Sequence, residues 1–101
     1  MNITSKQRSY LKGLAMNIDT LFQVGHEGVT PEFTASIREA IDKRELIKIG
    51  VLKNCDFDKK EIATMLAERT GSELVQIIGN KIVLYKFQKD DDKRRIDIRN
   101  V

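Results

Sequence analysis

The chain has 101 residues, and its 41% apolar and 33% charged side chains fit a single soluble globular domain. One cysteine, Cys55, cannot close an intramolecular disulfide, and one histidine cannot provide a zinc or iron ligand set, so we expect a cytoplasmic protein without metal or cofactor. The net charge of +3 comes entirely from residues 1–18, because residues 19–101 carry 15 basic and 15 acidic side chains, and no apolar run approaches the ~18 residues of a membrane span.

The first predicted element is a helix that begins after Thr4. Thr4 and Gln7 have the spacing of a capping box, and an apolar stripe follows at Leu11, Leu14, Ala15 and Ile18. All basic residues of this segment lie in the same helix: Lys6, Arg8 and Lys12. Such an acid-free patch favours a polyanionic partner, although a solvated helix face would have the same composition.

The next feature is a glycine loop between a strand and a helix. A short strand over residues 21–24 runs into Gly25-His26-Glu27-Gly28, and Thr30-Pro31 then predicts a helix start. Two glycines three apart let another backbone approach, and N–H groups at a helix start attract phosphate. A strand-to-helix turn also needs glycine for steric reasons alone, so both interpretations stay open.

The remaining elements follow from periodicity and turn signals. A helix is expected to end near Arg44, a strand to cover residues 46–52, and a third helix to begin at Asp58 and stop at Gly71. Residues 74–78 and 81–87 flank Gly79-Asn80 and predict a hairpin. The expected fold class is α/β, with the order helix-strand-helix-strand-helix-strand-strand and three helices packed on a mixed four-stranded sheet.

The C-terminal segment is expected to lie outside the packed domain. We place the domain at residues 1–88 and a charged, flexible tail at residues 89–101, which runs from three aspartates into Lys93-Arg94-Arg95. Ile96 and Ile98 alternate and allow a short edge segment. The neighbouring aspartates weigh against a basic tail that grips nucleic acid.

The chain lacks the side chains for catalysis. General acid-base or nucleophilic chemistry needs a nucleophile, a base and an orienting group, and no such set can be named around His26 or Cys55. The glycine loop also lacks the third glycine of a dinucleotide site and the Lys-Ser/Thr ending of a P-loop. What remains is the Gly-x-x-Gly turn with which KH-type modules clamp an RNA backbone, so we expect no enzyme.

Several motifs together resemble the CRM domain, the chloroplast RNA splicing and ribosome maturation domain, in its stand-alone bacterial YhbY-like form. The similarity covers residues 3–87 and rests on five segments: Thr4 to Arg8 with Leu11 and Ala15, Val24 to Thr30, Glu45 to Ile49, Thr70-Gly71, and Val75 to Lys86. The resemblance implies a fold like the C-terminal domain of bacterial translation initiation factor three. It also implies RNA binding associated with precursors of the large ribosomal subunit.

The resemblance assigns the RNA contacts to the glycine loop and to basic residues around it. Carried over by position, the candidate RNA-binding residues are Gly25, His26, Glu27, Gly28, Lys6, Arg8, Lys12, Lys48 and Lys86. The loop departs from the family pattern, which usually has a lysine after the first glycine where this chain has His26 and then Glu27. A carboxylate repels phosphate, so we expect a weaker clamp that relies more on N–H groups and on the first helix. His26 either donates to phosphate or is an exposed residue without a partner.

Two functions remain at this point. The first is a monomeric module that binds ribosomal RNA or the large-subunit precursor through phosphate contacts. The alternative is a protein-interaction adaptor that docks on an assembly intermediate by its sheet edge or tail, with incidental RNA contact.

Overall fold

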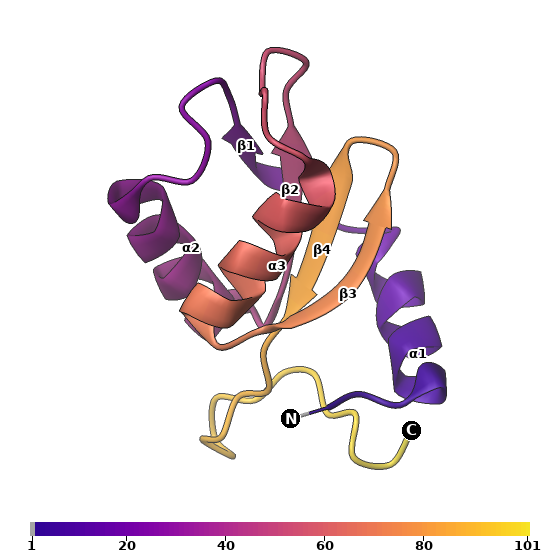
Figure 1. The fold of residues 1–101 in the computed structure, drawn as a ribbon. Helices are drawn as coiled ribbons and strands as arrows, with labels where there is room; N and C mark the ends of the chain where they lie inside the picture. Colours follow the sequence, from indigo (N-terminus) through magenta and orange to yellow (C-terminus); the bar gives the residue numbers. More distant parts are fainter. Residues whose placement is uncertain (1) are drawn as a thin grey trace.

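The computed structural model describes residues 2–101 and contains seven regular elements (Figure 1). Their bounds are α1 Ser5–Ala15, β1 Thr20–Val24, α2 Pro31–Arg44, β2 Leu46–Val51, α3 Lys59–Thr70, β3 Glu73–Ile78 and β4 Lys81–Tyr85. The sheet has the order β1-β2-β4-β3, in which β1 and β2 are parallel and the other two pairs are antiparallel. The predicted element order and the mixed four-stranded sheet are therefore confirmed.

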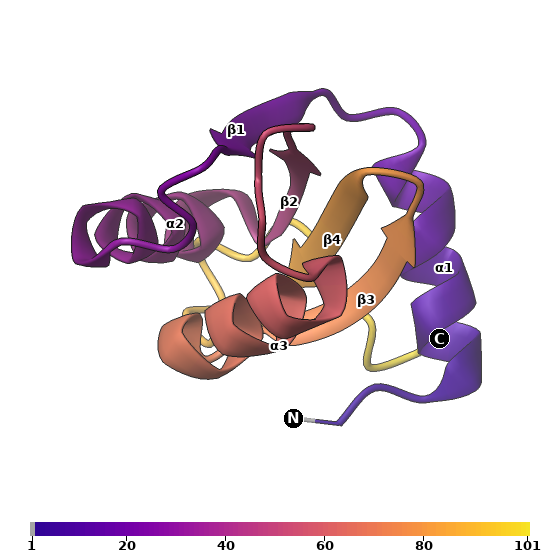
Figure 2. The same ribbon diagram turned by 45° about the horizontal axis from the view of Figure 1, so that its top comes forward.

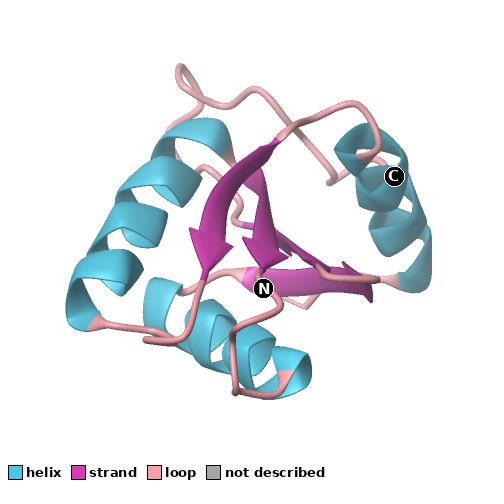
Figure 3. Ribbon diagram, turned by 90° about the horizontal axis from the view of Figure 1, so that it is seen from above, coloured by secondary structure: helices cyan, strands magenta, loops and turns pink. Residues whose placement is uncertain are grey.

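Helices cover both faces of the sheet (Figures 2 and 3). On one face, α2 and α3 bury Ile37, Ile41 and Leu66 against Ile47 and Ile49. The other face forms a second core, in which α1 packs on β2, β3 and β4 with this set of buried residues: Leu11, Ala15, Leu46, Val75, Val83, Tyr85 and Ile98. None of the helices in residues 2–101 is long and apolar enough to span a bilayer.

Local signals placed most helix ends correctly. Thr4 and Gln7 form the expected capping box, and Thr30 accepts a hydrogen bond from the Phe33 N–H. Asp58 occupies the N-cap position of α3 as expected, but its side chain makes no capping hydrogen bond. Helix α1 stops at Ala15, so Ile18 lies beyond it and packs from the following turn.

Three connections gather at one end of the sheet, which we call the loop end. Residues 25–30 follow β1, residues 52–58 follow β2, and the turn at Gly79-Asn80 joins β3 to β4 (Figure 1). The Val51 N–H donates to the Asn80 carbonyl at 2.8 Å, which ties the hairpin turn to the end of β2. The glycine loop therefore lies beside two other turns and opposite the C-terminal segment.

The C-terminal segment packs against the domain, where we expected a frayed tail. It contains no strand, but Ile98 is fully buried in the core beneath α1. Nearby, the Arg94 guanidinium lies 4.4 Å from the centre of the Phe87 ring. Burial of an isoleucine side chain contributes about 1.5–3 kcal/mol, which offsets the ordering of about one or two residues, so the hydrogen bonds of the segment are needed as well.

Glu45 holds this segment in place. The residue is only 1% exposed, and its carboxylate accepts hydrogen bonds from the backbone N–H groups of Arg95 and Ile96 at 2.8–3.2 Å. Its own backbone has φ 69°, donates to Ile41 and accepts from Lys86. Glu45 thus connects the end of α2 with Lys86, which follows β4, and with the backbone of the C-terminal segment.

Tyr85 makes the stability of this core sensitive to alkali. Burial, together with the nearby Glu45 and Asp97 carboxylates, raises the pKa of Tyr85 to about 12. Since the unfolded tyrosine ionises near pH 10, its contribution is complete below pH 10 and is lost as the pH rises toward 12. We expect the parent chain to lose about 2–3 kcal/mol relative to Tyr85→Phe over that window. Urea unfolding of both proteins from pH 8 to 12 measures the difference, and parallel pH profiles would contradict it.

Candidate functional site

The glycine loop is a tight turn that leaves its two central side chains in solvent. The Gly28 N–H donates to the Gly25 carbonyl at 3.0 Å, and Gly28 has φ 68°. His26 and Glu27 are both exposed at the tip. Helix α2 begins three residues later at Pro31, so N–H groups near the start of the helix face the same end of the molecule.

The two glycines have different roles. A Cβ atom at Gly28 would lie 2.6 Å from Cε2 of Phe57, so the Phe57 ring packs directly on the loop backbone. At Gly25 a Cβ atom would be 3.7 Å from its nearest neighbours, in Asn54 and Leu52, which is ordinary contact. The steric explanation for glycine therefore applies to Gly28, whereas Gly25 has room for a side chain.

A row of polar residues crosses the sheet face that carries α1. Gln23 pairs with Gly50 on β2, and Gly50 pairs with Lys81 on β4, so these positions form one line across three strands. Lys48 lies two residues from Gly50 on the same face. We call these four residues the sheet strip; Gln23 is exposed and both lysines are partly exposed.

Gly50 has no side chain, so the side chains of Gln23 and Lys81 can lie across it. A Cβ atom there would be 2.5 Å from the Gln23 side-chain oxygen and 3.3 Å from Lys81 Nζ, so both side chains fold over the glycine. Lys81 was not among the candidate residues from the sequence, because only the strand register places it opposite Gly50 and on the same face as Lys48. The predicted hairpin sets only the register of β4 with β3, and no turn joins β4 to β2, so the sequence contains no local signal for that pairing.

The basic residues of α1 divide between structural and exposed positions. The Arg8 guanidinium donates to the carbonyls of Leu74 and Val75, both at 2.6 Å, where the pairing of β3 shifts register. Lys12 follows one helical turn later and is partly exposed, and Lys6 is exposed. Within residues 2–101, neither lysine side chain makes a hydrogen bond or ion pair, so both remain available to a ligand, whereas Arg8 already anchors an edge strand.

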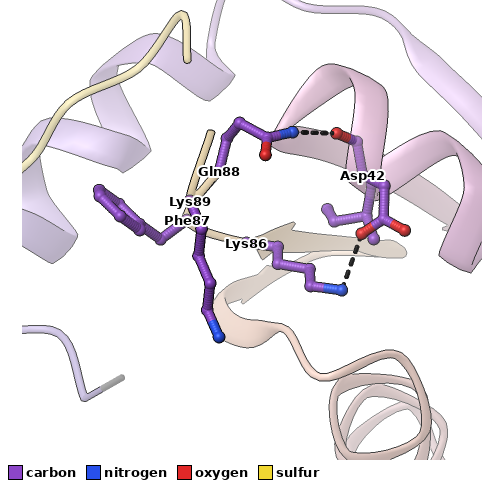
Figure 4. A pocket seen from close by; sticks show the side chains of 6 residues that line it. Asp42, Lys86, Phe87, Gln88 and Lys89 are labelled. Atoms are coloured by element: carbon purple, nitrogen blue, oxygen red, sulfur yellow. Dashed lines mark hydrogen bonds and ion pairs between the residues drawn. The ribbon is translucent and has the colours of Figure 1, made fainter. Parts of the chain in front are cut away.

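Lys86 is not part of the same surface. Its ammonium group lies 2.7 Å from the Asp42 carboxylate, and Gln88 donates to the Asp42 carbonyl at 2.9 Å (Figure 4). These residues line an open hollow of about 370 Å³ beyond the end of β4, opposite the loop end. The structure therefore brings Lys48 toward the glycine loop but places Lys86 at the other end of the molecule.

The loop end and the sheet strip together suit an anionic polymer. The loop supplies backbone N–H groups, and the strip adds two ammonium groups on neighbouring strands. Lysine is a flexible point charge that contacts phosphate without reading bases. Glu27 places a carboxylate at the exposed tip of the loop, and a weaker attraction for phosphate there stays a prediction.

Comparison with known proteins gives a consistent family assignment. The family model of the CRS1 / YhbY (CRM) domain matches residues 3–86. The Bacillus subtilis protein named "Probable RNA-binding protein YqeI" is 45% identical over 89 residues, which cover 88% of this chain and 93% of that protein. A Haemophilus influenzae protein named "RNA-binding protein" is 33% identical over 84 residues, or 83% of this chain and 85% of that protein.

The fold has a close counterpart among solved structures. A solution structure of a Staphylococcus aureus protein, described as a candidate RNA binding protein, matches with a TM-score of 0.77 and 44% sequence identity. The match covers 95% of this chain and 100% of that one. The resemblance noted from the sequence motifs is confirmed, and the chain belongs to the CRS1/YhbY (CRM) domain family.

Proposed function

We propose that this protein binds structured RNA through the glycine loop, the sheet strip and Lys12, and that its target is ribosomal RNA in precursors of the large subunit. RNA binding is supported by membership of the CRM family and by the names of the relatives. The ribosomal target rests on the family resemblance. Phosphate contacts carry the affinity, with few contacts to base edges.

The observation that carries this proposal is the alignment of Lys48 and Lys81 on one face next to the loop. Their strands pair directly, and Gly50 between them removes bulk from the surface. An RNA backbone that contacts N–H groups at residues 25–28 can continue over the sheet strip toward α1. Arg8 is not assigned an RNA contact, because its guanidinium already donates to the Leu74 and Val75 carbonyls of β3.

Single lysine substitutions are expected to weaken binding without changing its sequence preference. Lys12→Ala, Lys48→Ala and Lys81→Ala should each lower affinity for a large-subunit RNA fragment about three- to tenfold, and each should reduce the salt slope by about 1. Lys86→Ala, in which the lost cation is already paired with Asp42, is the control and should stay within about twofold. Filter-binding titrations at several salt concentrations measure both quantities.

The salt dependence of the parent protein tests the same proposal. Contact with about four phosphates should lower affinity roughly 50- to 150-fold between 50 and 200 mM salt. An affinity that stays flat over this range, or equal losses in Lys86→Ala and Lys48→Ala, would contradict a phosphate-binding surface at the loop end.

A protein-binding adaptor remains the second candidate because of one exposed edge. Ile77 and Ile78 near the end of β3 are 36% and 57% exposed on an edge strand that could pair with a partner strand. Tail docking has less support, since the tail is packed on the domain. Crosslinking in cells separates the two functions: the adaptor predicts protein adducts at β3, and RNA binding predicts RNA adducts at the loop end.

A further inference from the structure

A small hollow lies between the glycine loop and α3. It measures about 100 Å³ and is lined by Glu27, Val29, Phe57, Glu61, Ile62 and Met65. Its walls come from the glycine loop, from the loop after β2 and from the first turns of α3. The site is thus continuous with the proposed phosphate contact, and the inference below rests on that proposed function.

Phe57 gives the hollow a surface on which a nucleobase can stack. One part of its ring packs on Gly28, yet the residue remains 51% exposed. Met65 and Val29 add apolar contacts from the neighbouring elements. An exposed aromatic ring held rigidly beside a phosphate-binding loop is the arrangement by which proteins take up unpaired bases.

The polar groups that line the hollow are two carboxylates. Glu27 and Glu61 both line it, and within residues 2–101 neither carboxylate makes a hydrogen bond or an ion pair. Ionised carboxylates only accept hydrogen bonds. Guanine offers two adjacent donors, N1–H and the N2 amino group, on its Watson–Crick edge, whereas adenine, cytosine and uracil each present an acceptor beside their donor.

We propose that this hollow binds one unpaired guanine of the RNA, with Phe57 stacking on the base and Glu27 or Glu61 accepting its N1–H and N2–H groups. Glu27 then contributes to RNA binding. Glu27 weakens the attraction for phosphate but reads the base of the nucleotide held there. The departure from the usual lysine-containing loop becomes a source of base preference.

The test uses two stem-loop RNAs that differ at one position, an all-uridine loop and the same loop with one guanine. We expect the parent protein to bind the guanine loop about tenfold more tightly, which corresponds to about 1.4 kcal/mol. Glu27→Gln and Glu61→Gln should each reduce this ratio several-fold, because the guanine loses a hydrogen-bond acceptor. Glu27→Gln should in addition tighten the uridine loop modestly, because its charge no longer repels phosphate at the loop tip. Glu68→Gln is the matched control, because Glu68 lies on the same helix outside the hollow.

Substitution of the ring tests stacking separately. Phe57→Leu keeps apolar bulk against Gly28 and should weaken binding of the guanine loop about tenfold, with an unchanged unfolding transition as a check on the fold.

Equal affinity of the parent for both RNAs would overturn the guanine site while leaving the lysine and salt results intact. If Glu27→Gln tightens both RNAs to the same extent and leaves their affinity ratio unchanged, Glu27 acts by charge repulsion alone and the guanine site is overturned too. Failure of the parent to bind either RNA would overturn this site together with the proposed function.

Discussion

Glu45→Ala is expected to lower the free energy of unfolding by about 3 kcal/mol, because two partly buried N–H groups lose their acceptor and the tail loses its anchor. The carboxylate is 1% exposed and serves the N–H groups of Arg95 and Ile96. For a domain of this size the loss corresponds to a fall in Tm of about 12–20 °C. Thermal and urea unfolding measure it, and Glu45→Gln should retain part of the stability because one oxygen still accepts.

A double-mutant cycle shows whether the effect acts through the tail. Ile98→Ala alone should cost about 2–3 kcal/mol, since Ile98 is fully buried. Combined with Glu45→Ala, the total should be smaller than the sum of the two, because either change releases the same segment. Glu39→Ala is the control on α2, where an exposed pair with Lys43 contributes under about 0.5 kcal/mol. A Glu45→Ala protein as stable as Glu39→Ala would contradict a buried anchor.

Gly28→Ala is the second change with a large expected effect. The new Cβ would lie 2.6 Å from the Phe57 ring, and φ 68° is unfavourable for alanine. We expect a loss of about 2 kcal/mol in unfolding free energy and about a tenfold loss in RNA affinity as the loop N–H groups move. Chemical unfolding and RNA titration are the two measurements.

Gly25→Ala provides the matched comparison within the same loop. Its Cβ would have ordinary contacts at 3.7 Å, so stability should stay within about 0.5 kcal/mol of the parent. Adding Phe57→Leu to Gly28→Ala should recover only part of the loss, because the backbone strain at positive φ remains. Equal destabilisation by Gly25→Ala and Gly28→Ala would contradict the separate roles assigned to the two glycines.

Features with local causes could be predicted from the sequence. The capping box at Thr4, the N-cap at Thr30 and the turn at Gly79-Asn80 all depend on residues within a few positions of one another. The same holds for the alternation that places Ile47 and Ile49 on one face of β2. Such local signals were sufficient to predict the element order and the mixed sheet.

Features that depend on distant pairs could not be predicted. The bond from Arg8 to β3 and the capping of residues 95 and 96 by Glu45 join segments at least 50 residues apart. The contact of Phe57 with Gly28 likewise joins two separate loops and is visible only in the fold. For the same reason the sequence did not bring Lys81 into the candidate surface or show that Lys86 lies at the opposite end of the molecule, beside Asp42.

The most direct test of the RNA-binding surface is an amide NMR titration of the ¹⁵N-labelled protein with a large-subunit rRNA stem-loop. We predict the largest shift changes in residues 23–28, 48–51 and 79–82, with little change in residues 86–99. Changes confined to residues 86–99 or to the β3 edge, with the glycine loop and the sheet strip unaffected, would contradict RNA binding at the loop end.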